Sequence, residues 1–171
     1  GCSDIQPVVV TINPKPSVII TKPAPVCSGS AVDITSAAIT AGSTTGLVYS
    51  YFKDPAATIL LSNPNVIGAS GTYYIQGSDA SGCSDIQPVQ VTINPLPVAS
   101  ISYNGSPYCS QGVAYASLTG QAGGIFVSTL GLSINSSTGD INLVTSTEGT
   151  YPVVYTFTNG TCGKSDITSV T

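Results

Sequence analysis

The chain has five cysteines, and their regular spacing is its clearest chemical signal. Cys2 and Cys83 lie 81 positions apart, Cys27 and Cys109 lie 82 apart, and Cys162 follows Cys83 by 79. No two cysteines are separated by only two residues and the chain has no histidine, so the usual zinc and thiol-exchange motifs are missing. A periodic set of this kind is typical of structural disulfides in an oxidising compartment.

Several states of these cysteines fit the spacing. We expect Cys27 to pair with Cys83, and Cys109 with Cys162, which leaves Cys2 for a partner upstream. The alternative joins Cys2 to Cys27 and Cys83 to Cys109, across the joints between repeats. Buried free thiols in a cytosolic protein are a third interpretation. Spacing along the chain does not distinguish these arrangements.

Other reactive groups are sparse. The chain contains no histidine, one glutamate (Glu148) and four basic residues, all lysine, so general bases and phosphate-binding groups have almost no candidates. The seven aspartates stand singly, without the alternating pattern of a calcium loop. We therefore expect no enzymatic activity, no catalytic residue, no cofactor and no metal site.

The charge and the aromatic residues indicate which kinds of partner the chain could bind. A net charge of −4 with four scattered lysines excludes the electrostatics of nucleic-acid binding. No apolar run approaches the length of about 18 residues that a membrane helix needs, so no membrane insertion is expected. The chain has nine tyrosines, and exposed rings suit glycans. Alternation places Tyr49 and Tyr51 in the core and makes Tyr74 the better surface candidate.

The segments that carry these groups occur as repeats. Residues 1–14 read GCSDIQPVVVTINP, residues 82–95 read GCSDIQPVQVTINP, and residues 161–168 carry a third, divergent copy. A period of about 80 residues is the length of a small domain rather than of a solenoid turn. We expect residues 1–14 to be the closing strand of a preceding module, followed by modules at residues 15–95 and 96–171.

The joints and strands indicate an all-β array. Pro14 and Pro16, like Pro95 and Pro97, are spaced by one residue after an alternating strand, which predicts short, semi-rigid linkers. Each module holds about seven short β-branched runs separated by turn residues, the number expected of an immunoglobulin-like sandwich. These runs are predicted at 17–21, 31–35, 47–52, 58–61, 72–77 and 84–93, and then at 99–103, 113–118, 125–128, 132–134, 141–143, 151–158 and 166–171.

Two tyrosines begin the penultimate strand of their modules. Tyr73 and Tyr151 each follow Gly-Thr, 10 or 11 positions before a late cysteine. A tyrosine in this position is similar to the one that closes a corner of the sandwich by bonding to upstream backbone. We therefore expect both to be structural.

The combined motifs resemble the tandem Ig-like repeats of large Bacteroidetes surface proteins. They are VCSG at 26–29, GTYY at 71–74 and the closing motif at 82–95; residues 123–126, 131–142 and 149–157 resemble a second repeat type of the same proteins. The resemblance implies an extracellular location on the bacterial surface, export by the type IX route, and a place in an adhesin or gliding-type fibre. It implies fold and spacing rather than a ligand site.

Three functions follow as hypotheses. The first is a non-enzymatic structural stalk or fibre segment, whose partners are the neighbouring Ig-like modules of the same chain. The second is a self-assembling extracellular filament in which other copies are the partners, because low charge and a mean hydropathy of +0.32 leave apolar surface available. The third is a module that binds a glycan or a protein through loops such as 41–46 or 120–124.

Overall fold

The computed structural model describes residues 1–171, and the chain is built from strands, turns and loops with no helix, which confirms the predicted all-β class. Two compact units are present, Gly1–Ile93 and Asn94–Thr171. They are called unit 1 and unit 2 below and are described separately. No helix capable of crossing a membrane is present.

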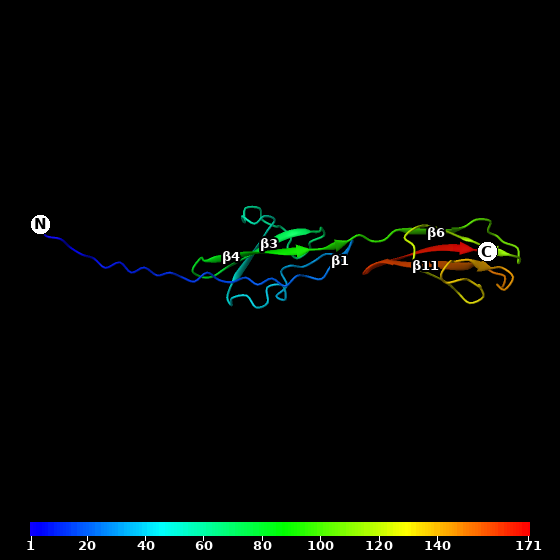
Figure 1. Ribbon diagram of the computed structural model, residues 1–171, viewed down its shortest axis with the longest axis horizontal. Coiled ribbons are helices and arrows are strands. Elements are labelled where there is room, and N and C mark those ends of the chain that lie inside the picture. Colours follow the sequence, from blue (N-terminus) through cyan, green and yellow to red (C-terminus); the bar gives the residue numbers. More distant parts are fainter. The chain divides into compact units, whose positions relative to one another are not determined.

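The main sheet of unit 1 has three antiparallel strands in the order β2 (Val48–Phe52), β3 (Gly71–Ser78) and β4 (Ser84–Val91) (Figure 1). Alternate residues of β4 are buried, among them Asp85, Val89 and Val91. This period of two places one face of the strand against the core.

The opposite layer of unit 1 is mostly irregular. The short β1 (Val26–Cys27) hydrogen-bonds with β5 (Ile93–Asn94), and Val32 forms an isolated bridge with Ile67. The strands predicted at 17–21 and 31–35 are not formed, and the run at 58–61 makes only one bridge. Nearby prolines lack the N–H that a ladder needs, and the Asp33 carboxylate accepts the N–H of Thr35 at 2.8 Å in a local turn.

The core of unit 1 lies between these layers. It contains seven buried aliphatic side chains, drawn from both: Val32, Ile34, Ile39, Ile67, Ile75, Val89 and Val91. Gly77 of β3 is covered so closely that a Cβ there would lie 2.8 Å from side-chain atoms of both Val18 and Leu47. The first segment of the unit therefore packs directly on the sheet.

Unit 2 has more regular strands. One sheet has the order β12 (Cys162–Val170), β11 (Tyr151–Asn159), β9 (Ile125–Ser128). The remaining strands form two antiparallel pairs, β6 (Ala99–Tyr103) with β8 (Ala116–Gly120), and β7 (Val113–Ala114) with β10 (Ile141–Asn142).

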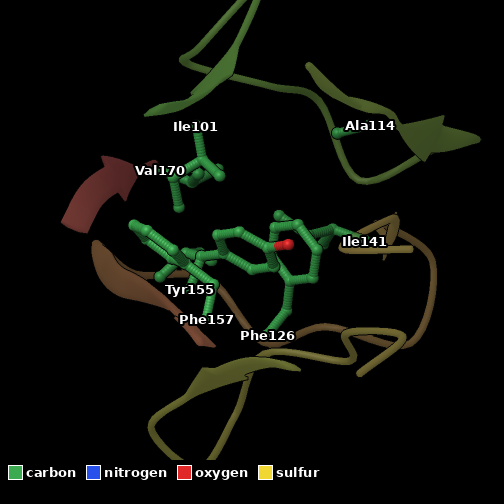
Figure 2. Close-up of a cluster of buried hydrophobic side chains, with 8 residues drawn as sticks. Ile101, Ala114, Phe126, Ile141, Tyr155, Phe157 and Val170 are labelled. Atoms are coloured by element: carbon green, nitrogen blue, oxygen red, sulfur yellow. The ribbon is translucent and has the colours of Figure 1, made fainter. Parts of the chain in front are cut away.

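An aromatic cluster fills the core of unit 2 (Figure 2). Val153, Tyr155 and Phe157 alternate along β11 and are at most 1% exposed. The Tyr155 ring lies 4.4 Å from that of Phe126 and 5.3 Å from that of Phe157, centroid to centroid. Such ring pairs add to the free energy gained by burying their area.

The N-terminal segment, residues 1–14, forms no strand in this structure and is exposed throughout. Ile5, Val8, Val9, Val10 and Ile12 are between 77% and 90% exposed. The copy at residues 82–95, which differs only by Gln90 in place of Val9, forms β4 and β5 and pairs with β3 and β1. The module boundaries predicted at 14/15 and 95/96 remain predictions.

Candidate functional site

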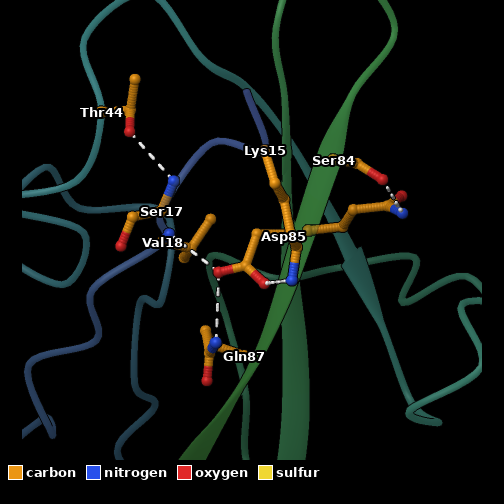
Figure 3. Close-up of polar contacts among 8 residues, drawn as sticks. Lys15, Ser17, Val18, Thr44, Ser84, Asp85 and Gln87 are labelled. Carbon is orange, nitrogen blue, oxygen red and sulfur yellow. Dashed lines mark hydrogen bonds and ion pairs between the residues drawn. The ribbon is translucent and has the colours of Figure 1, made fainter. Parts of the chain in front are cut away.

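The repeated Ser-Asp-Ile motif of unit 1 places a carboxylate on the inner face of β4 (Figure 3). Asp85 is 7% exposed and accepts the backbone N–H of Val18 at 3.0 Å, the Gln87 side-chain amide at 3.1 Å, and the Lys15 ammonium at 2.5 Å. These bonds, that to Lys15 foremost, lower the pKa of Asp85 to about 2 from an ordinary value of 3.8. We call Asp85 with Val18 the aspartate clamp of unit 1.

In unit 2, the aspartate of the same motif also accepts a backbone N–H from the first segment of its unit. Asp166, which follows Ser165 in β12, accepts the backbone N–H of Ile101 in β6 at 2.9 Å. This pair is the aspartate clamp of unit 2. In the exposed N-terminal copy, Asp4 accepts only the side chain of Gln6.

A second tie joins the first segment of each unit to its last strand. Val26 donates its N–H to the Thr92 carbonyl at 3.1 Å, and Tyr108 donates to the Thr171 carbonyl at 2.9 Å. The chain runs forward from the clamp to this tie on both partners, from Val18 to Val26 and from Asp85 to Thr92. The first segment and the last strand therefore run side by side in the same direction.

One tyrosine in each unit bonds to the backbone four residues upstream. The hydroxyl of Tyr73 donates to the carbonyl of Ala69, and that of Tyr151 to the carbonyl of Thr147, each at 3.1 Å. These are the upstream backbone bonds that the sequence predicts for both tyrosines. Tyr49 and Tyr51 pack against the core of unit 1, as alternation predicts. Tyr115, 72% exposed, is a surface ring that the sequence analysis did not single out.

The two loops considered for ligand binding are tied to their own units. In loop 41–46, Ser43 and Thr44 accept the backbone N–H groups of Ile19 and Ser17 at 2.8 and 2.9 Å. In loop 120–124, the Tyr155 hydroxyl accepts the Gly124 N–H at 2.9 Å and donates to the Gln121 carbonyl at 3.0 Å. These hydrogen bonds give both loops a structural role.

Two further aspartates accept hydrogen bonds from backbone N–H groups. Asp54 accepts the N–H groups of Thr58 and Ile59, and Asp79 accepts those of Ser81 and Cys83. No group of three or more potential ligands that could hold a metal ion is present. Asp54 and Asp79 thus each close a local turn, as short polar side chains commonly do.

The cysteine pairs expected from spacing are not formed. Cys2, Cys83 and Cys109 are free thiols, whereas Cys27 and Cys162 are disulfide-bonded. Cys27 lies in β1, beside the end of the last strand, while Cys83 precedes the start of β4. Eight residues of strand at about 3.4 Å each separate those ends, far beyond the reach of a disulfide.

The same correction applies in unit 2. Cys109 follows Tyr108, which bonds to Thr171, whereas Cys162 begins β12 at its other end. The alternative pairs, Cys2 with Cys27 and Cys83 with Cys109, are also absent because Cys2, Cys83 and Cys109 are free. Spacing reveals the period of the cysteines, but it does not reveal at which end of a strand each one lies.

A groove opens at the Thr171 end of unit 2. Its cavity volume is about 390 Å³, and its lining includes Tyr108, Cys109, Leu132, Leu143, Glu148 and Thr171. Tyr108, Leu132 and Leu143 are partly buried against the aromatic core. The groove therefore has a mixed lining, in which apolar side chains lie beside Ser110, Ser146, Thr147 and the carboxylate of Glu148. The sequence analysis did not identify it.

One family model matches most of unit 1. Residues 14–95 match the model of the family described as Ig-like domain CHU_C associated. The match and the sheet topology support an Ig-like β-sandwich of this type. No curated protein matches the chain.

Solved Ig-domain proteins are more distant neighbours. The insect immune protein hemolin is 15% identical with a TM-score of 0.36, and the match covers 89% of this chain and 45% of hemolin. The N-terminal four Ig domains of Dscam1 isoform 6.9 are 14% identical with a TM-score of 0.37, covering 90% and 44% of the two chains. This chain spans less than half the length of either structure.

Proposed function

We propose that this chain is a load-bearing, non-enzymatic segment of an extracellular stalk or fibre on a bacterial surface. The observation that carries the proposal is the shared direction of the first segment and the last strand in each unit, with ties at both ends. The Ig-like match of unit 1 and the resemblance to tandem repeats of Bacteroidetes surface proteins support the location.

The parallel direction of the first segment and the last strand determines how a unit responds to a pulling force. A force that separates the two ends of unit 1 slides the segment from Val18 to Val26 past β4, because the two elements are pulled oppositely along one axis. The bonds at Asp85 and at Thr92 are then loaded together instead of opening one after another. Unit 2 has the same arrangement between Ile101 and Asp166 and between Tyr108 and Thr171.

Stretching single chains under reducing conditions tests this role. We expect two unfolding events per chain. Asp85→Asn should speed one event, and Asp166→Asn the other, by about five- to thirtyfold, the effect of one or two kcal/mol on a rate. Asp4→Asn alters the same motif where it holds no backbone of a unit, so it is the matched control.

If both clamp variants unfold at the wild-type rate at every force, the clamps carry no load and the stalk function loses its structural basis. An equal effect of Asp4→Asn would attribute the change to charge rather than to the clamp.

A further inference from the structure

A groove in unit 1 lies on the face of the main sheet that points away from the core. Its cavity volume is about 440 Å³, and it is lined by Ile20, Lys22, Thr72, Pro88 and Gln90. This volume is within the range of about 300–1,000 Å³ that is typical of small-molecule sites. We call it the β4 groove, because Pro88 and Gln90 belong to that strand.

The register of β3 and β4 brings the sheet side of this groove together. Thr72 is the partner of Gln90, and Tyr74 is the partner of Pro88. Side chains alternate between the two faces of a strand, and Val89 is buried, so Pro88 and Gln90 on either side of it point outward with their partners. The outer face therefore carries a hydroxyl and an amide directly beside two rings. Tyr74 is the tyrosine that alternation along the sequence places on the surface.

The other wall of the β4 groove is the first segment of the unit, which is fixed in place. Thr21, between Ile20 and Lys22, donates its backbone N–H to the Ile39 carbonyl at 2.8 Å. Pro23 restricts the backbone of Lys22, the residue before it. Ile20 packs against the core of the unit. The groove is therefore preformed, and a ligand that enters it has to order little of the chain.

Lys22 is the one charged side chain that lines the β4 groove. It forms no ion pair, because the salt bridge of this structure joins Lys15 to Asp85. Its exposed ammonium carries three N–H donors and attracts an anion. The chain as a whole has a net charge of −4, so this local positive charge is a property of the groove rather than of the surface in general.

We propose that the β4 groove binds an acidic saccharide, a sugar that carries a carboxylate. The Lys22 ammonium pairs with the carboxylate. Thr72 and Gln90 exchange hydrogen bonds with the sugar hydroxyls, since a hydroxyl and an amide each both donate and accept. The rings of Tyr74 and Pro88 contact the apolar face of the sugar ring. This site adds a ligand to a segment whose proposed function is structural.

An extended peptide fits this place less well than a sugar. A peptide that adds to a sheet bonds to the N–H and C=O groups of the edge strand. Pro88 has no N–H to offer, and the first segment of the unit already lies alongside β4, from the bond at Val18 to the bond at Val26. Rings, a hydroxyl and an amide on a sheet face instead suit a flat ring with hydroxyls at its edge.

Titration of the ¹⁵N-labelled chain with tetragalacturonate, a carboxylated sugar, tests the site by NMR. We expect the amide signals of residues 20–22, 72–74 and 89–90 to shift, and those of unit 2 to stay in place. The methyl-esterified tetramer keeps the rings and hydroxyls but loses the charge, so it should bind about fivefold more weakly. No shifts at about 10 mM tetragalacturonate, shifts spread over both units, or equal binding of the two tetramers would overturn the proposal.

Two substitutions separate the charge from the amide. Lys22→Gln should raise the dissociation constant for tetragalacturonate about fivefold and reduce its dependence on salt. Lys53→Gln changes an exposed lysine outside the groove in the same way and should leave both unchanged. Gln90→Val introduces the residue that stands at Val9 in the other copy of the motif, and valine suits a strand, so the fold is kept. It should weaken binding about two- to tenfold, the effect of one lost hydrogen bond.

Two outcomes of these titrations would overturn the assignment of the ligand. If Lys22→Gln and Lys53→Gln weaken binding equally, the effect is one of net charge and the β4 groove is not the site. If tetraglutamate, an acidic peptide, shifts the same amide signals with a lower dissociation constant, the occupant is a peptide and not a saccharide. These measurements apply no force, so the binding site and the stalk function can fail separately.

Discussion

The Asp85 carboxylate accepts the backbone N–H of Val18 at 3.0 Å, across 67 positions of sequence. This bond joins the first segment of unit 1 to its last strand, and Asp166 forms its counterpart with Ile101 in unit 2. A buried carboxylate is costly unless its oxygens are bonded, and Lys15 and Gln87 complete the set. The motif that identifies the repeat is thus also the motif that closes each unit.

Asp85→Asn tests the contribution of the clamp to stability. The amide keeps the shape of the side chain but loses the charge-assisted bonds, so we expect the free energy of unfolding of unit 1 to fall by about 1 to 2 kcal/mol. Hydrogen exchange of peptides from residues 71–91 measures this within unit 1. Asp4→Asn, in the exposed copy, should leave the exchange unchanged. Equal protection in the Asp85 variant would show that the clamp is not stabilising.

Acid should weaken unit 1 through the same group. The pKa of Asp85 is about 2 in the folded chain, below its ordinary value of 3.8, because Lys15 and the Val18 N–H favour the carboxylate. The stabilisation is therefore present above about pH 4 and is lost as the pH falls through 2. Denaturation curves from pH 5 to pH 2 should converge for the wild type and Asp85→Asn. A gap that stays constant with pH would contradict this.

Removal of the corner hydroxyls should loosen both units. Tyr73→Phe and Tyr151→Phe keep the ring but leave the carbonyls of Ala69 and Thr147 without this donor, which typically costs about 0.5 to 1.5 kcal/mol. Thermal unfolding detects the change. Tyr115→Phe, at a ring 72% exposed, is the control and should have no effect.

The alternation of apolar and polar residues predicted some strands correctly and others wrongly. The penultimate and last strands follow alternation and are present, because burial on one face imposes a period of two. The run at 17–21 forms no ladder. It is held by side-chain bonds from Asp85, Ser43 and Thr44, and by two single backbone bonds that involve Ser17 and Thr21. Such bonds depend on contacts distant in sequence, and no local window contains them.

The candidate site was less accessible from the sequence. The groove is lined by Tyr108, Leu132, Leu143 and Glu148, which are up to 40 positions apart in sequence, so no local pattern brings them together. The cysteine pairs failed for a related reason, since the ends of a strand are distinguished only once its neighbours are known. The corner tyrosines, by contrast, bond four residues upstream, within reach of sequence reasoning.

Alkylation of the unreduced, dilute chain tests the cysteine assignment. Cys2, Cys83 and Cys109 are free, and Cys2 and Cys109 are exposed, so an iodoacetamide-type reagent should label these three before reduction. Cys27 and Cys162 are disulfide-bonded and should be labelled only after reduction. Peptide mapping by mass spectrometry reads both states, with the reduced, denatured chain as the control for complete labelling. A peptide that joins Cys27 to Cys83 would contradict the register of β1 and β4, because that bond cannot span the length of the strand.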